Sequence, residues 1–251
     1  MSDVPYILGH SPAEVRRLML QAAILKPITE RLLREAGLTP GLRVLDLGCG
    51  CGDVAMLAAE LVGPNGAVVG IDRSAEVLAV ARERAQAAGH ANIQFRESAA
   101  EDFVDQAPFD LAIGRYVLIH QGNPAAFIRS AASHVRRGGI IAFHEIGIYG
   151  ECQALPPVPL WQQTWSWARA GLRSVMVHPD AGGRMIAHFH EAGLSSRRCS
   201  AKSRSTAVQI PQSTPGWHSQ CAACCHKSRR LVPPRQRRSI STPWRTACAT
   251  R

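Results

Sequence analysis

Aspartate and glutamate are absent from the last 57 residues of the chain. Residues 195–251 hold 12 of the 29 lysines and arginines and none of the 19 acidic residues, so the formal net charge of +10 arises in this segment. The 194 residues before it contain 17 basic and 19 acidic side chains. The main part of the chain therefore lacks the basic excess of a nucleic-acid-binding domain, and we do not expect a nucleic-acid partner.

Long hydrophobic runs and a targeting segment are also absent. The most apolar stretch, residues 111–119, is short and contains Arg115, so we expect no membrane-spanning segment and no membrane partner. The opening Met-Ser-Asp-Val-Pro lacks the basic start and apolar run of a secretory signal. The eight cysteines lie in a chain too large for a small disulfide scaffold. These features favour a cytoplasmic protein.

The hydrophobic pattern alternates between strands and helices. Apolar runs predict strands at 43–47, 67–71, 93–96, 109–113 and 140–146, the last after a turn at Gly138-Gly139. Helical periodicity predicts helices from Ser11 to Pro27, where proline interrupts, and at 28–36, 53–62, 74–88, 123–134, 156–173 and 180–192. This order predicts an α/β fold with a doubly wound, mainly parallel sheet and helices on both faces.

A glycine-rich loop follows the first predicted strand. Its sequence is Asp46-Leu47-Gly48-Cys49-Gly50-Cys51-Gly52-Asp53. Glycines between a strand and a helix let the backbone approach a ligand at the helix N-terminus. The spacing departs from the dinucleotide pattern G-x-G-x-x-G, and Asp46 and Asp53 would repel a pyrophosphate. These acids suit a ligand with a sulfonium and an amino group.

A carboxylate also ends the second predicted strand. Gly70-Ile71-Asp72 places Asp72 where its carboxylate could accept both hydroxyls of a ribose. The alternative is that Asp72 caps the following helix, but Ser74 already serves as the cap.

Together these motifs resemble those of the class I S-adenosylmethionine-dependent methyltransferases. Residues 44–52 are similar to the first motif of that family, 69–72 to the second, 109–111 with 115–118 to the fourth-strand motif, and 135–139 to the turn before strand five. The likeness covers about residues 6 to 194 and is closest to the quinone-biosynthesis-like, small-molecule branch. It implies a Rossmann-like fold, S-adenosylmethionine as cofactor and a small-molecule methyl acceptor. Methyl transfer is an in-line displacement at an activated methyl group, so no metal is expected.

The resemblance implies that Asp46 and the glycines contact the methionine part of the cofactor and Asp72 its ribose. After the third strand the family usually has an aspartate for the adenine amine, and Ala99 stands there. Glu101 or Asp102 takes over that contact, or backbone groups and packing hold the adenine. The residues expected to bind the cofactor are Asp46, Gly48, Cys49, Gly50, Gly52, Asp72, Arg73, Ala100, Glu101 and Arg115.

Candidate residues for the acceptor side follow the fourth and fifth strands. His120 is the best-placed catalytic base, with His144 and Glu145 next, although each could instead have a structural role. Trp161 and Trp165 share a helix face and could wall an acceptor pocket or pack their helix, which also holds Trp167, onto the domain.

The chain is expected to divide into a helical lid at 1–38, which includes Tyr6 by resemblance, a cofactor-binding domain at 39–194 and a basic tail at 195–251. The tail lacks the alternation of the two strands that end this family's fold, so we expect those strands to be missing and the tail to be disordered. A nucleic-acid-binding arm, half a zinc site around residues 221–226 and an out-of-frame translation are the alternatives.

Reading one base earlier turns every Cys or Trp codon into one for Leu, Val or Met. Apolar residues would then replace Trp217, Cys221, Cys224 and Cys225, which have the spacing of an amphipathic helix. Two other functions stay open at this point. The first is a cofactor-binding protein without turnover, and the second is an RNA methyltransferase that holds phosphates with the tail.

Overall fold

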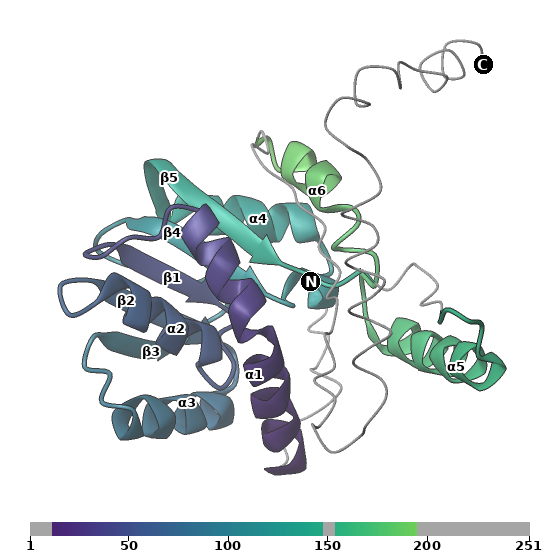
Figure 1. Cartoon of the computed structure of the whole chain (residues 1–251). Helices are drawn as coiled ribbons and strands as arrows, with labels where there is room; N and C mark the ends of the chain where they lie inside the picture. The colour runs from purple at the N-terminus through teal and green to yellow at the C-terminus, as the bar shows by residue number, and fades with distance from the viewer. Residues whose placement is uncertain (1–11, 148–153, 195–251) are drawn as a thin grey trace, which may run out of the picture. The chain divides into compact units, whose positions relative to one another are not determined.

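A computed structural model of the chain describes residues 12–147 and 154–194. Its elements are α1 (Pro12–Glu35), β1 (Arg43–Leu47), α2 (Asp53–Val62), β2 (Ala67–Asp72), α3 (Ala75–Ala87), β3 (Ile93–Glu97), β4 (Phe109–Arg115), the 3-10 turn η1 (Leu118–His120), α4 (Pro124–Ser133), β5 (Val135–His144), α5 (Pro159–Val175) and α6 (Met185–Glu191) (Figure 1). The described residues all lie within one compact unit of the chain.

The five strands form one sheet in the order β3-β2-β1-β4-β5, and every neighbouring pair is parallel. Because all strands run the same way, their carboxyl ends meet at one edge. The strand order reverses between β1 and β4, and ligands of open α/β sheets bind at that point of the carboxyl edge.

Two buried clusters cover the two faces of the sheet. On one face, Leu33 of α1 and Val54 of α2 belong to one buried cluster with Val44 of β1 and Leu111 of β4. On the other, Ile128 of α4 packs with Leu45 of β1, in the cluster that also holds the end of α6 at Ala192. Helix α3 packs against β2 and β3. The predicted doubly wound parallel sheet with helices on both faces is confirmed.

Helix α1 continues through Pro27, and the predicted interruption there is wrong. Proline removes one backbone hydrogen bond and bends a helix without always ending it. Figure 1 shows the axis of α1 changing direction part-way along its length. Thr29 and Leu33, both fully buried, anchor the part after the proline to the domain, and this packing keeps the chain helical.

Strand β5 begins at Val135, and the predicted turn at Gly138-Gly139 is instead an irregularity within the strand. Phe109 pairs with Val135, and the next pair in register is Leu111 with Ile140. Gly138 has a left-handed φ of 76°, and a Cβ on Gly139 would lie 2.7 Å from the Asp110 carbonyl oxygen. Glycines therefore absorb the extra residues of a bulge here.

The predicted helices at 156–173 and 180–192 correspond to α5 and α6, with shifted ends. Across the described residues, no helix is long and apolar enough to cross a membrane. Tyr6 and the predictions made for residues 195–251, including the missing last strands, lie outside the described residues.

Candidate functional site

The glycine loop after β1 lies directly against the turn after β4. A Cβ on Gly48 would lie 3.1 Å from Cγ2 of Val117. These two segments leave the sheet at adjacent strands of the carboxyl edge, where the strand order reverses. The predicted glycine loop and the predicted base, His120 in η1, are therefore brought to the same place.

All three loop glycines have left-handed backbone conformations, with φ of 63° at Gly48, 52° at Gly50 and 81° at Gly52. Their environments differ. A Cβ on Gly52 would lie 2.9 Å from the ring of Phe95, so this glycine allows helix and strand to pack closely. A Cβ on Gly50 would meet no atom within 4 Å. Gly50 thus borders open space that a ligand can use.

Asp72, at the end of β2, is hydrogen-bonded to the glycine loop that follows β1. Its Oδ2 accepts a hydrogen bond of 3.0 Å from the Gly50 N–H, and its Oδ1 accepts one of 3.0 Å from the Ser74 N–H. Ser74 caps α3 itself by accepting from the Val77 N–H, as predicted. A carboxylate has about four lone-pair positions, so Asp72 keeps the capacity to accept further hydrogen bonds.

Asp46 is the buried acid of the site. Its side chain is 1% exposed, and Oδ2 has no hydrogen-bond partner. Burial raises the pKa of Asp46 to about 8, although the charge of Arg115 and a backbone hydrogen bond from Ala55 oppose the shift. A buried carboxyl with a free oxygen is costly unless a polar or cationic group meets it, so Asp46 suits a cationic ligand.

Asp53, the second acid that flanks the glycines, is already paired. Its carboxylate lies 2.7 Å from Arg84 and 3.9 Å from Arg115. The two arginines balance its charge. Of the two acids, Asp46 is therefore the one suited to meet a cationic ligand.

Arg115 is the last residue of β4, and the other predicted cofactor residues lie on the loops that follow β1, β2 and β3. Arg73 and Glu101 form an exposed ion pair of 2.6 Å. Ala100 is buried, and its carbonyl accepts a hydrogen bond of 2.8 Å from the Ser130 hydroxyl. Cys49 is buried as well, and burial raises the pKa of its thiol well above its usual range. Their roles toward a cofactor stay predictions.

The turn after β4 carries His120, the first of the acceptor-side candidates. Tyr116 has a left-handed φ of 56°, which is rare for a bulky residue and marks strain. His120 ends the turn, and burial lowers the pKa of its imidazole, which is therefore neutral at pH 7. Glu145 reaches this turn from the end of β5 and accepts hydrogen bonds from its backbone.

His144, the second candidate base, is tied to α1. Its Nδ1 lies 3.0 Å from Oγ1 of Thr29, and its ring meets that of Tyr116 edge-on at 5.5 Å. Burial and the charge of Arg115 lower the pKa of His144 to about 4. Sequence reasoning missed Thr29 and the strained Tyr116, since neither residue type signals its contact or conformation along the chain.

The tryptophans lie on α5, which has no fully buried residue. Trp161 and Trp167 are exposed, and Trp165 is half-buried. Neither the acceptor pocket nor the packing interpretation of these residues is tested by this arrangement. Within the described ranges, no group of three or more His, Cys, Asp or Glu residues is arranged to hold a metal ion.

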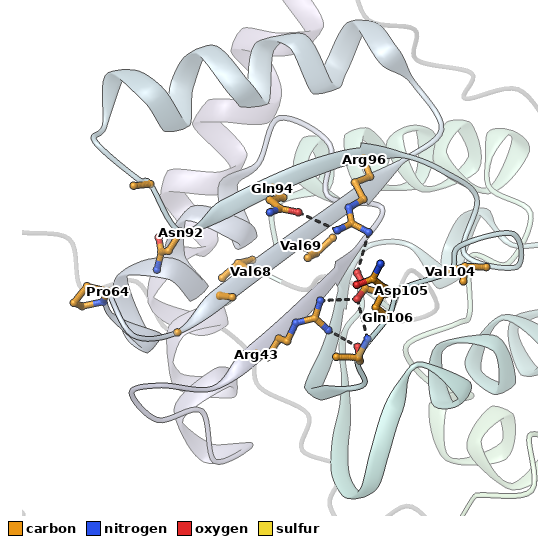
Figure 2. A pocket seen from close by; sticks show the side chains of 14 residues that line it. Arg43, Pro64, Val68, Val69, Asn92, Gln94, Arg96, Val104, Asp105 and Gln106 are labelled. Atoms are coloured by element: carbon orange, nitrogen blue, oxygen red, sulfur yellow. Dashed lines mark hydrogen bonds and ion pairs between the residues drawn. The ribbon is translucent and has the colours of Figure 1, made fainter.

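A cavity of about 860 Å³ lies elsewhere, beside the amino-terminal parts of β1 and β2. Figure 2 shows Arg43 and Arg96 pointing toward Asp105, at 2.7 and 2.9 Å from its carboxylate. Asp105 pairs with both guanidinium groups, which, with a backbone hydrogen bond from Ala107, lower the pKa of its carboxyl although burial opposes this. The cavity contains none of the predicted site residues.

The fold and the site together define a Rossmann-like cofactor-binding protein. Its marks are a parallel sheet whose strand order reverses, a glycine loop with left-handed φ values at the carboxyl edge, and an acid at the end of the second strand. Residues 38–177 match the family model described as a methyltransferase domain. The chain belongs to this family, the class I S-adenosylmethionine-dependent methyltransferases.

Curated relatives match parts of the chain. Ubiquinone biosynthesis O-methyltransferase of Paracidovorax citrulli is 37% identical over 114 residues, which are 44% of this chain and 47% of that protein. Arsenite methyltransferase of Aquipseudomonas alcaligenes is 31% identical over 137 residues, 46% of this chain and 40% of that protein. The match thus spans less than half the length of each of these two relatives.

Among solved structures, a SAM-dependent methyltransferase from Aquifex aeolicus superposes with a TM-score of 0.54 at 19% identity. The match covers 74% of this chain and 89% of that one. At this identity the likeness supports the fold and carries no information on the acceptor.

Proposed function

We propose that this protein transfers a methyl group from S-adenosylmethionine to a small-molecule acceptor. The observation that carries the proposal is the buried Asp46 carboxyl, whose Oδ2 has no partner, in the strand that leads into a glycine loop with open space at Gly50. A cationic, nucleoside-containing cofactor satisfies both features. When bound, S-adenosylmethionine supplies a methyl group activated by the positive charge on its sulfur.

Different residues of the chain bind different parts of the cofactor. Asp46 accepts from, and balances the charge of, the methionine part, while Asp72 uses its remaining lone pairs for the ribose hydroxyls. The loop after β3 binds the adenine. Ala100 packs against the ring, and the Glu101 carboxylate accepts from the adenine amine, because Ala99 stands where the family usually has an aspartate. The remaining members of the proposed binding set line the same edge: Gly48, Cys49, Gly52, Arg73 and Arg115.

His120 takes up the proton of an O–H or N–H acceptor. Burial lowers the pKa of His120, so the ring is neutral near pH 7 and can accept a proton. A positively charged imidazole could not fill this role and would also repel a cationic cofactor. His120 is therefore the group to which we assign general-base catalysis.

A small acceptor and a cytoplasmic location are parts of the same proposal. One relative reported above is named for ubiquinone biosynthesis and the other for arsenite, and both names refer to small molecules. The part of the chain before residue 195 has no basic excess that would favour RNA.

Isothermal titration of the full chain with S-adenosylmethionine tests the cofactor assignment, with NADH as the control ligand. We expect saturable binding of the former alone. Incubation with methyl-labelled cofactor and fractionated metabolite pools then tests transfer. Binding with no labelled product from any pool would show a cofactor-binding protein without turnover and would contradict the enzymatic part of the proposal.

A further inference from the structure

Glu145 directly follows β5, and its side chain reaches the turn after β4. Its Oε1 accepts two hydrogen bonds of 2.8 Å, from the N–H groups of Val117 and Leu118. These are backbone donors at the start of a three-residue 3-10 turn, which has no helical partners of its own for them. One carboxylate oxygen from β5 therefore supplies the bonds that the turn cannot make internally.

The segment that leads from β4 into this turn needs such support because Tyr116 is strained. Tyr116 holds a φ of 56°, a conformation that costs a non-glycine residue about 1–2 kcal/mol. Its N–H donates to the His144 carbonyl at 2.9 Å, and on the far side the His178 N–H donates to the Ile119 carbonyl at 3.0 Å. The backbone around Tyr116 to His120 is thus held by β5 on one side and by the segment before α6 on the other.

Burying the Glu145 carboxyl destabilises the fold. Oε2 of Glu145 is buried and has no hydrogen-bond partner. Burial raises the pKa of the Glu145 carboxyl to about 7, in spite of the backbone donors at Leu118, Val117 and Ile119. An apolar or amide side chain would avoid much of this desolvation. Since stability alone does not explain an acid here, its benefit lies in what the turn carries.

We propose that Glu145 is a positioning residue, which fixes the turn from Tyr116 to His120 and so sets the place and burial of the His120 imidazole. The inference rests on the proposed function for the chemical meaning of His120, but the geometric relation stands by itself. Glu145 contacts backbone, and His120 is the group that it positions for the acceptor.

The test uses the full chain with Glu145→Ala and Glu145→Gln. Glu97→Ala, which removes an exposed acid at the end of β3, is the matched control. In Glu145→Ala, amide hydrogen exchange at Val117 and Leu118 should accelerate at least about tenfold, while Ala112 and Ile113 in β4 keep their protection. Glu145→Gln keeps an acceptor oxygen and should retain most of the protection at the two turn amides. It also serves if the alanine variant fails to fold.

A second readout follows His120 directly by NMR titration. When the turn loosens, water reaches the imidazole, so the pKa of His120 should rise from its lowered value toward the ordinary one in Glu145→Ala. Tyr116, Arg115 and His144 belong to the same electrostatic cluster, since the charges of Arg115 and Glu145 both act on Tyr116 and that of Arg115 acts on His144. These three groups stay the same in both variants. Loss of the negative charge of Glu145 would by itself lower the pKa of His120, so a rise in this pKa reports the loosened turn.

The positioning role is supported if the pKa of His120 rises in Glu145→Ala and rises much less in Glu145→Gln. Turn amides and a His120 titration that match wild type in both variants would overturn it. Both measurements use the protein without cofactor, so a failure of S-adenosylmethionine binding would refute the proposed function and leave this test intact.

Discussion

The hydroxyl of Thr29 in α1 lies 3.0 Å from Nδ1 of His144 at the end of β5, although 115 residues separate them in the chain. Thr29 is fully buried, so this hydrogen bond ties the part of α1 after Pro27 to the carboxyl edge of the sheet. The first helix is therefore attached beside the candidate site through a specific polar contact as well as through apolar packing.

Replacing Thr29 with valine keeps the shape of the side chain and removes the hydrogen bond. We expect a loss of about 1 kcal/mol in the free energy of unfolding, or about 2–4 °C in Tm for a chain of this size. Thr164→Val is the control, because its hydroxyl bonds to the Leu160 carbonyl on an exposed helix face. Equal melting temperatures for the two variants would contradict the importance of the Thr29 bond.

Gly50→Ala should weaken binding of S-adenosylmethionine by at least about tenfold, since the new methyl group enters the open space beside the loop. The matched control is Gly89→Ala. Gly89 also has a left-handed φ, of 76°, and also borders open space, but it lies after α3. Both variants should lose similar stability from backbone strain. Calorimetry that finds equal affinities for both would show that Gly50 does not face the cofactor.

Asp72→Ala should weaken binding by about 1.5–3 kcal/mol, the usual value for a hydrogen bond to a charged group. Glu97, its register neighbour on β3, is exposed and ends the adjacent strand, so Glu97→Ala is the appropriate control. An unchanged dissociation constant for Asp72→Ala, measured well below its melting temperature, would limit Asp72 to holding the Gly50 and Ser74 amides.

Cofactor affinity should rise with pH. With a pKa of about 8, Asp46 is protonated at pH 6 in the free protein, and a cationic ligand favours its carboxylate, so binding releases a proton. The association constant should increase by up to about tenfold from pH 6 to pH 7. Asp46→Asn should bind more weakly and lose this dependence. A wild-type affinity that is flat across this range would show that Asp46 does not meet the cation.

The same group predicts the pH dependence of stability without ligand. The folded pKa of Asp46 is raised, so above pH 4 the folded chain holds a proton that the unfolded chain has lost, and stability falls as pH rises toward 8. Below about pH 6.5 the lowered pKa values of His120 and His144 act in the opposite sense. We therefore expect Tm to decrease from pH 7 to pH 8 in the wild type, and to decrease less in Asp46→Asn.

The local parts of the fold and the site could be predicted from the sequence. The glycine loop, the Ser74 cap and the acid at the end of β2 are short motifs, and each depends on neighbours within a few residues. The alternation of strands and helices then determines the parallel sheet, because short crossovers leave few other topologies.

What the sequence did not predict depends on contacts between distant segments. Pro27 stays within α1 because Thr29 and Leu33 are buried against the rest of the domain. Glu145 contacts amides that lie 27 and 28 residues away, and Tyr116 adopts a conformation that its residue type disfavours. Asp53 suggested a charge free for a ligand, but Arg84 on α3 neutralises it.

The hydrogen bond between Gly50 and Asp72 affects the kinetics and the heat-capacity change of ligand binding. The three loop glycines hold their left-handed conformations, and the hydrogen bond from Gly50 to Asp72 fixes the loop through the protein's own groups. A preformed receptor loses little conformational entropy on association, so docking need not wait for the loop to reorganise. Association should then follow simple second-order kinetics, with a heat-capacity change that reflects buried ligand surface rather than folding of the loop.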